Sequence, residues 1–439
     1  MTPLGAGLIV VLGLLFCLGI GTPIAFALGF VSIVTLMIAE GPGSLSILAE
    51  TFFGGIASFS LLSIPMFILM GAAVSSSPAG KDLYDALDRW LNRVPGGLVL
   101  SNLGACAIFA ALSGSSPATC AAIGKMGIPE MTGRGYPKEV AAGSIAAGGT
   151  LGILIPPSIT LIVYGISTET SIGRLFMAGI LPGIMLTGLF MAWTIYYCHR
   201  RGVGMEDLTR RFTMKERFAI LPRVLPFLAI VVGILYVLYG GVATPSEAAG
   251  VGAVFCLLLV VVIYRIWNFA TFSTIFRDTL RDSVMIMMII GASELFSFTL
   301  SSLFVTQSIA EWIAGLAANK WVIIAIVNVF LLIAGFFLPP VAVIVMTAPI
   351  LLPIITQAGF DPYWFAIVLT INMEIGLITP PVGLNLYVIN SIAPDISLRQ
   401  ILMGSLPYVL CMVTAIIILC IVPEIATWLP TLMMGQEIQ

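Results

Sequence analysis

Two stretches of the sequence decide the fold. Residues 148–158 read GGTLGILIPPS, and residues 372–385 read NMEIGLITPPVGLN. Each stretch lies inside a long apolar run, 138–168 and 362–393, and each carries two consecutive prolines. A proline has no backbone N–H and its ring clashes with the preceding helical turn, so a helix is interrupted at both points. The two runs are therefore predicted to be discontinuous membrane spans.

The composition of the whole chain excludes a soluble protein. Of 439 residues, 59% are hydrophobic and 9% are charged, whereas a soluble domain carries about 25% charged residues. A helix of about 20 apolar residues crosses a bilayer once. Such runs also fall near 4–20, 24–39, 58–78, 175–199, 218–240, 244–264, 283–303 and 400–423. We expect an all-α polytopic membrane protein whose first run is a retained span, because no basic residue precedes it as in a signal peptide.

Shorter apolar runs occur in two pairs. Residues 94–112 and 116–131 are joined by the sequence SGSSP, and residues 321–338 and 341–356 are joined by Pro339-Pro340. Non-helical backbone at membrane depth is tolerated where protein buries it or where it lines a water-filled cavity. Each pair is therefore predicted to form a re-entrant helical hairpin.

The order of these features occurs twice. Matching positions lie 220 to 225 residues apart: Gly71 with Gly291, Thr22 with Thr244, Pro117 with Pro340, Pro129 with Pro353, Pro156 with Pro380, and Arg174 with Arg399. A repeat at one period indicates two homologous halves. We predict a first repeat over 1–200 with a hairpin at about 94–131, a basic linker over 201–219, and a second repeat over 220–439 with a hairpin at about 321–356.

The basic residues predict the orientation, because cytoplasmic loops are enriched in Lys and Arg. The segment 200–223 is the most basic, with Arg200, Arg201, Arg210, Arg211, Lys215, Arg217 and Arg223. Counting crossings from this segment places every basic residue on the cytoplasmic side except Arg174 and Lys320, out of 19. The repeats are then inverted, with the first hairpin entering from the cytoplasm and the second from the outer side. The connection 40–57 and both termini are expected on the outer side.

Inverted repeats with broken helices place helix ends near the bilayer midplane in secondary transporters. Carbonyl and hydroxyl oxygens there replace the hydration shell of Na+, while helix N-termini attract anions. The residues expected at a first Na+ site are Ser113, Ser115, Ser116, Gly148, Gly149 and Pro156. Those expected at a second Na+ site are Gly335, Asn372, Glu374, Gly376 and Thr379. Substrate contacts are expected from Ser116, Thr119, Ser158, Thr379 and Asn385.

A competing interpretation applies to each of these residues taken alone. Ser, Thr and Gly at helix interfaces in membranes often serve only for close packing and hydrogen bonding. Three acids, Glu247, Glu294 and Glu374, also lie in or beside apolar runs, where ionisable groups are functional candidates. Glu374 is the one nearest to a helix break, so its charge is expected to support the second cation site or a structural pair.

Residues 81–94 have a different pattern. Leu83, Leu87 and Leu91 recur at helical spacing among charged residues, which predicts an amphipathic helix on the cytoplasmic surface. Two functions fit this helix: an arm between a fixed scaffold and a moving hairpin domain, or an anchor at the membrane interface.

The motifs resemble a known family. SGSSPAT at 113–119, GGTLGILIPPS at 148–158 and NMEIGLITPPVGLN at 372–385 are similar to the large membrane subunit of TRAP (tripartite ATP-independent periplasmic) transporters. TPIAFALG at 22–29 and ATPSEAAGVGA at 243–253 extend the resemblance over essentially the whole chain. It implies a Na+-coupled secondary importer of organic anions, mostly carboxylates, in the bacterial inner membrane, with an elevator-type movement of the hairpin domain.

The resemblance also implies partners. These are a small four-helix membrane subunit on a separate chain and a periplasmic substrate-binding protein, within membrane lipid and without nucleic acid; Na+ is the only metal and the coupling ion. The outer side is then the periplasm. One departure concerns the second hairpin tip, GFFLPPVAV from Gly335, where many members have an acidic residue and this chain has Pro339. A substrate inferred from the best-known relatives, such as sialic acid, is therefore not carried over.

Three other functions compete with this interpretation. A standalone Na+-coupled carboxylate carrier has the same hairpin plan, and an anion channel also uses re-entrant loops. An intramembrane enzyme fits least, because His199 is the only histidine and neither HExxH nor GxSxG occurs. The seven cysteines form no CxxC pair, so they indicate neither a zinc site nor a disulfide framework.

Overall fold

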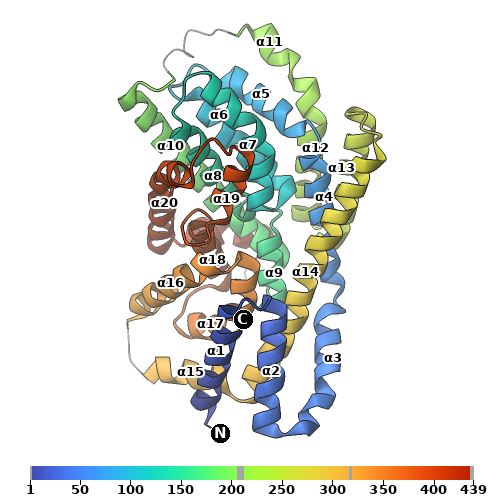
Figure 1. Cartoon of the computed structure of the whole chain (residues 1–439), viewed down its shortest axis with the longest axis vertical. Coiled ribbons are helices and arrows are strands. Elements are labelled where there is room, and N and C mark those ends of the chain that lie inside the picture. The colour runs from blue at the N-terminus through green and yellow to red at the C-terminus, as the bar shows by residue number, and fades with distance from the viewer. Residues whose placement is uncertain (1, 205–211, 316–318, 436–439) are drawn as a thin grey trace.

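The computed structural model describes residues 2–204, 212–315 and 319–435, and every regular element within these ranges is a helix (Figure 1). The first half contains α1 (Pro3–Gly19), α2 (Ile24–Glu40), α3 (Leu45–Ile56), α4 (Ser63–Ser75), α5 (Ala79–Leu91), α6 (Gly97–Ser113), α7 (Ser116–Gly133), α8 (Lys138–Leu154), α9 (Ile159–Ser167) and α10 (Ile172–Arg201). The short 3-10 helices η1 (Pro42–Ser44) and η2 (Phe59–Leu62) precede α3 and α4.

The second half follows the same order. It contains α11 (Met214–Ala219), α12 (Leu221–Tyr239), α13 (Pro245–Leu258), α14 (Phe269–Ser302), α15 (Val305–Gly315), α16 (Lys320–Phe337), α17 (Pro340–Gln357), α18 (Pro362–Leu377), α19 (Leu384–Ile392), α20 (Leu398–Ile421) and α21 (Glu424–Met434). A π-helical turn, η4 (Leu259–Ile263), ends α13. The hairpins are α6–α7 and α16–α17, and the broken helices are α8–α9 and α18–α19.

Both predicted helix breaks are confirmed. The first broken span bends by 40° between α8 and α9, and the second is interrupted between Leu377 and Leu384. The Pro156-Pro157 and Pro380-Pro381 peptide bonds are both cis. At the first hairpin tip Gly114 has a φ of +56°, a left-handed conformation that favours glycine.

The described helices are those of a multi-pass membrane protein. Seven of them are long and apolar enough to cross a bilayer, and up to nine spans result if each bent pair is one span. These comprise α10, α12, α13 with its π-turn, α14, α16, α17 and α20, with the pairs α3–α4 and α8–α9. Shorter apolar helices of the chain are α1, α2, α6 and α18.

The structure corrects three boundaries. The connection expected over 40–57 is mostly helical, because α3 fills 45–56 and continues into α4 with a bend of 53°. The span expected near 283–303 begins earlier, at Phe269, and the helices α15 and α21 were not expected. A search for runs of about 20 apolar residues passes over short helices such as α3. It also passes over the N-terminal part of α14, because Arg277, Asp278, Arg281 and Asp282 interrupt its apolar residues.

The amphipathic helix predicted over 81–94 is α5, and it packs on the protein. Leu83 and Tyr84 are buried, and the helix lies against α6 of the first hairpin. At its far end the Arg89 Nη1 atom donates a hydrogen bond to the Glu216 carbonyl oxygen of α11 at 2.6 Å. Figure 1 shows α5 and α11 at one end of the molecule and the N-terminus at the other. Part of the expected linker, residues 205–211 with Arg210 and Arg211, lies outside the described residues.

A stripe of small residues holds α8 in the centre of the molecule. Residues 141–154 of α8 are all buried, and α6, α7 and α20 pack around it. At the crossing with α20, a Cβ atom on Gly404 would collide with the Glu139 carbonyl oxygen, and one on Gly143 would collide with the Gly404 backbone. Small residues let helix backbones approach closely in membranes. The two glycines therefore set the distance between the first broken helix and the last long span.

We expect Gly404→Ala to destabilise the protein, since the added methyl group forces α8 and α20 apart. Overpacking of this kind costs about 1–3 kcal/mol, so the melting temperature in detergent should fall. Gly188→Ala on α10 is the matched control, because nothing lies within 4 Å of the added atom. Equal melting temperatures for the two variants would contradict this account of the crossing.

Candidate functional site

The first hairpin tip is held together by its own hydroxyl groups. The Ser113 Oγ and Thr119 Oγ1 atoms lie 2.7 Å apart, and Thr119 Oγ1 donates to the Ser115 carbonyl oxygen at 2.9 Å. Ser113, Ser116 and Thr119 are all buried. Ser115 is the N-cap of α7, so the tip presents a helix N-terminus inside the protein. Such a terminus carries unpaired N–H groups and a partial positive charge.

The first broken helix lies directly against this tip. A Cβ atom on Gly152 would be 2.7 Å from the Ser115 carbonyl oxygen and 2.9 Å from Thr119 Oγ1. Gly149 faces the Cys120 thiol of the hairpin, and a Cβ atom on Gly148 would be 2.9 Å from Cys106 Sγ. The structure thus places the predicted Gly148 and Gly149 in contact with the hairpin helices, and it adds Gly152, which sequence reasoning missed.

The second half repeats this arrangement. Gly376, 224 residues after Gly152, lies against the Gly335 backbone of the second hairpin, so closely that a Cβ atom would collide with it. The Val382 N–H, just beyond the second proline pair, donates to the Phe336 carbonyl oxygen of the hairpin at 3.2 Å. In both halves the helix next to the proline pair therefore packs a glycine against the hairpin tip of the same repeat.

Two other residues of the predicted second site, Asn372 and Thr379, bond to the neighbouring hairpin and to their own helix, respectively. The Asn372 amide donates to Asn328 Oδ1 on α16, which ties the broken helix to the hairpin. The Thr379 hydroxyl donates to the Ile375 carbonyl oxygen at 2.6 Å and remains half-buried. Asn372 thus fixes the position of the hairpin, while Thr379 lies at the break itself.

Ser158 and Pro156 lie on the far side of the first break. Ser158 is the N-cap of α9: its Oγ accepts from the Leu161 N–H at 3.3 Å and donates to the Ile153 carbonyl oxygen at 2.5 Å. Pro156 lies beside Gly179 of α10. Because the Ser158 hydroxyl donates to Ile153 of α8 and accepts from Leu161 of α9, it links the two half-helices across the break.

Residues predicted for different sites meet between the two repeats. The Ser116 hydroxyl donates to Glu374 Oε2 at 3.4 Å and accepts from the Asn385 Nδ2 atom at 2.9 Å. Asn385 Nδ2 also donates to the Ala146 carbonyl oxygen at 3.1 Å. All three side chains are fully buried. Sequence order could not show this contact, because it joins the first hairpin to the second broken helix across more than 250 residues.

The other two acids of the apolar runs have different positions. Glu247 completes a capping box with Thr244 at the start of α13, with its Oε2 accepting from the Thr244 N–H at 2.8 Å. Glu294 lies in the middle of α14 against Gly55 of α3. Neither residue contacts the hairpin tips, so of the three acids only Glu374 belongs to the candidate site.

An ion-pair cluster at the base of the first hairpin was not predicted. Arg134, just after α7, pairs with Glu130 at 2.5 Å and with Asp88 of α5 at 3.5 Å. Burial and the nearby Asp88 carboxylate raise the pKa of Tyr84 well above its ordinary value, so this hydroxyl stays neutral. The cluster connects the amphipathic helix to the hairpin at the end where α11 lies. Its signal in the sequence is the set of charged residues within 82–93, which the sequence analysis placed on a cytoplasmic-surface helix that serves as an arm or as an interface anchor.

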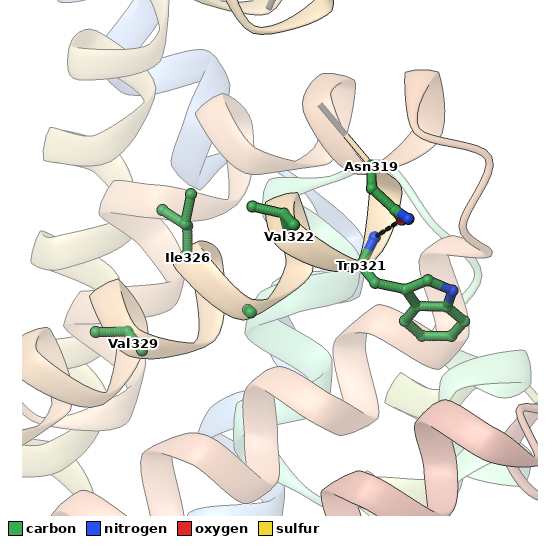
Figure 2. Close-up of a pocket in the computed structure, with 6 residues that line it drawn as sticks. Asn319, Trp321, Val322, Ile326 and Val329 are labelled. Atoms are coloured by element: carbon green, nitrogen blue, oxygen red, sulfur yellow. Dashed lines mark hydrogen bonds between the residues drawn. The ribbon is translucent and has the colours of Figure 1, made fainter. Parts of the chain in front are cut away.

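Two hollows on the described surface are lined by residues outside the hairpin tips. The larger, of about 470 Å³, is an apolar groove along α16 lined by Trp321, Val322, Ile326 and Val329, with Asn319 at its end (Figure 2). A smaller one of about 150 Å³ lies beside the second break, lined in part by Pro380, Pro381, Tyr387 and Arg399. Within the described ranges, no three His, Cys, Asp or Glu side chains gather as a metal site would require.

Comparisons with known proteins agree with this geometry. Residues 11–425 match the family model of the tripartite ATP-independent periplasmic transporter, DctM component. The chain belongs to this family. It is 38% identical over 404 residues to the C4-dicarboxylate TRAP transporter large permease protein DctM of Pseudomonas aeruginosa, covering 92% of this chain and 93% of that protein. It is 37% identical to the protein of the same name from Vibrio cholerae, covering 98% of both chains.

A solved structure shows the same fold. The YdaH transporter of Alcanivorax borkumensis superposes with a TM-score of 0.62 over 90% of each chain, at 16% sequence identity. The similar permeases are transport proteins, so this chain is the large permease subunit of a TRAP transporter and not an enzyme. The family resemblance expected from the motifs and the inverted-repeat membrane fold are both confirmed.

The glycine contacts at the two tips predict a functional effect. We expect Gly152→Ala and Gly376→Ala each to push a hairpin tip away from its broken helix and to lower the transport rate about tenfold, because overpacking costs about 1–3 kcal/mol. Gly233→Ala on α12, where nothing lies within 4 Å, is the control. Transport measured in proteoliposomes should separate the three variants, and wild-type rates in both tip variants would be the contradicting result.

Proposed function

We propose that this chain imports an organic anion across the bacterial inner membrane by coupling its movement to Na+. The observation that carries the proposal is the repeated contact between a hairpin tip and a proline-broken helix, with Gly152 against Ser115 and Gly376 against Gly335. Helix interruptions of this kind supply carbonyl oxygens for cations and N–H groups for anions at membrane depth. Both tasks are met without an ionised side chain.

The two tips are the proposed Na+ sites. At the first, the Ser113 hydroxyl lies 3.5 Å from the Ser115 carbonyl oxygen, and Gly114 of the same tip lies against the Pro157 carbonyl oxygen of the break. At the second, the Gly335 backbone and the Thr379 hydroxyl lie at the equivalent break. A hard monovalent cation prefers oxygen ligands, and the unwound backbone offers them in both repeats.

The substrate is proposed to be a carboxylate, and C4-dicarboxylates are the first compounds to test. Two similar permeases, from Pseudomonas aeruginosa and Vibrio cholerae, are named for them. The N-terminus of α7, which begins at Ser116, presents a partial positive charge to an anion, and Arg399 lines the hollow beside the second break. Pro339 at the second tip adds no charge that would repel a dianion.

The movement is proposed to be of the elevator type. The first hairpin and both broken helices pack around α8, and the second hairpin packs on α9 and α18, while α2, α3, α4, α13 and α14 form a second group. Helix α5 joins α4 to α6, and thus connects the second group to the first. The second group serves as the scaffold on which a small four-helix membrane subunit would assemble, and a periplasmic binding protein would deliver the substrate. Both termini are then periplasmic.

Uptake into proteoliposomes tests the function. Vesicles containing this chain and its small partner should accumulate a labelled C4-dicarboxylate only with an inward Na+ gradient and with the binding protein present. Na+-driven uptake without the binding protein would replace the tripartite function by a standalone carrier. Flux that ignores the Na+ gradient would contradict the proposal and favour an anion channel.

The first Na+ site has its own test. Replacing Ser113 and Ser115 together by Ala removes hydroxyl oxygens at the tip, and we expect the Na+ concentration for half-maximal uptake to rise about tenfold, since each lost hydrogen-bonding or ligand oxygen is worth about 1 kcal/mol or more. Ser171→Ala, at the N-cap of α10, is a control that also removes a serine hydroxyl in the same repeat. An unchanged Na+ dependence in a well-expressed double variant would refute the assignment.

A further inference from the structure

The short surface helix α11 is anchored by an arginine. Its other side chains are exposed, whereas Arg217 is only 8% exposed. The Arg217 guanidinium lies over the Trp90 ring of α5, 5.4 Å from the ring centroid. Among the described residues, no carboxylate forms an ion pair with it. The cation–π contact offsets part of the cost of burying a charge, but within the described chain the charge of Arg217 has no negative partner.

The unpaired donors of Arg217 lie on one edge of the side chain. Its Nε and Nη2 atoms are enclosed by protein, and neither has a hydrogen-bond partner among the described residues. The guanidinium group is planar and rigid, so the Nε–H bond and one Nη2–H bond leave it side by side and nearly parallel. This edge matches two oxygen atoms of one carboxylate or phosphate group. Both open donors therefore converge on a single oxyanion by covalent geometry alone.

The acids closest along the chain have other partners. The Glu216 Oε2 atom accepts from the Thr213 N–H at 2.7 Å and from the Thr213 hydroxyl at 2.8 Å, which completes the capping box of α11. Asp88, which precedes Trp90 in α5, pairs with Arg134 at 3.5 Å. Buried unpaired polar atoms are rare in native proteins, and each requires a water, an ion or a functional explanation. For two adjacent N–H donors of a cation, that explanation is an anion.

The surface around this edge has the composition of a membrane interface. Trp90 is 41% exposed and Phe218 is 54% exposed, and their rings pack edge to face with centroids 5.8 Å apart. The side chains of Arg93 and Lys215 are exposed on the same two helices, which lie at one end of the molecule (Figure 1). Aromatic and basic residues together are typical of the headgroup region of the cytoplasmic leaflet, where anionic lipids carry phosphate. The distribution of Lys and Arg predicts that this end of the molecule is cytoplasmic.

We propose that the Nε–Nη2 edge of Arg217 binds one phosphate group where α5 meets α11. The exposed aromatic rings beside it favour the headgroup of an anionic phospholipid as the source, and inorganic phosphate has the same chemistry. Arg217 is the only buried side chain of α11, so a small shift of this helix uncovers the enclosed edge. Two charge-assisted hydrogen bonds to the phosphate then give both open donors a partner.

The site lies at the end of the helix that leads to the first hairpin. Helix α5 joins α4 to α6, and its Arg89 Nη1 atom donates to the Glu216 carbonyl oxygen of α11 at 2.6 Å. A phosphate held by Arg217 adds a second connection at this point, between α11 and the membrane surface. The bound lipid therefore anchors the end of α5 from which the first hairpin extends. This inference does not rest on the proposed Na+ coupling.

Thermal unfolding of the purified full chain in a maltoside detergent without phosphate tests the site. Phosphatidylglycerol, inorganic phosphate, and a diacylglycerol with the same acyl chains but no phosphate are each added in increasing amounts. We expect phosphatidylglycerol to raise the melting temperature of the wild type, and its half-maximal mole fraction to rise about tenfold in Arg217→Gln, which loses both donors. Arg223→Gln is the matched control, because it removes the same charge from an exposed arginine of the same basic segment, and it should respond as wild type.

Stabilisation by phosphatidylglycerol that depends on Arg217 identifies a lipid headgroup as the ligand, and stabilisation by inorganic phosphate that depends on Arg217 identifies a soluble one. The proposal is overturned if neither compound stabilises the wild type, if diacylglycerol acts as well as phosphatidylglycerol, or if Arg217→Gln and Arg223→Gln respond alike. Arg217→Lys replaces Arg217→Gln where the latter fails to fold, because it keeps the charge but cannot form two parallel hydrogen bonds. A wild-type midpoint in Arg217→Lys then overturns the site.

Discussion

The two proline pairs create backbone groups that no helix satisfies, inside a protein surrounded by lipid. Around Pro156-Pro157 and Pro380-Pro381 the helical hydrogen bonds end and resume several residues later. In hydrocarbon such groups must be buried in protein or line a water-filled space. The hairpins meet this requirement, because each brings a tip to the break of its own repeat, and the Val382 N–H bonded to the Phe336 carbonyl oxygen is one direct example.

Close approach at these points depends on glycine. At Gly152 and Gly376 the backbone of a hairpin tip occupies the space that a side chain at these positions would need. Gly143 and Gly404 allow α8 and α20 to approach each other in the same way. In the proposed function, the same close packing brings the ligand groups of each tip and break together. Under that proposal, the packing role and the functional role of these glycines are not alternatives.

The repeats, the breaks and the hairpins were predictable because each leaves a local signal in the sequence. Proline pairs interrupt apolar runs, and inversion follows from the distribution of Lys and Arg. Short helices such as α3 and the polar start of α14 were missed, because apolar length alone identifies neither. The contact of Ser116 with Glu374 and Asn385 was also not predicted. The hydrophobic periodicity of a sequence does not show which hairpin packs against which helix break.

The number of Na+ ions that move with each substrate molecule tests the account most directly. Net substrate flux is measured in proteoliposomes at a series of Na+ gradients. The membrane potential and substrate gradient at which the flux reverses give the number of Na+ ions per substrate molecule. Na+ sites at both hairpin tips predict a ratio above one, and a lower ratio for the double variant Ser113→Ala with Ser115→Ala than for Ser171→Ala. A reversal point that does not move with the Na+ gradient would contradict the account.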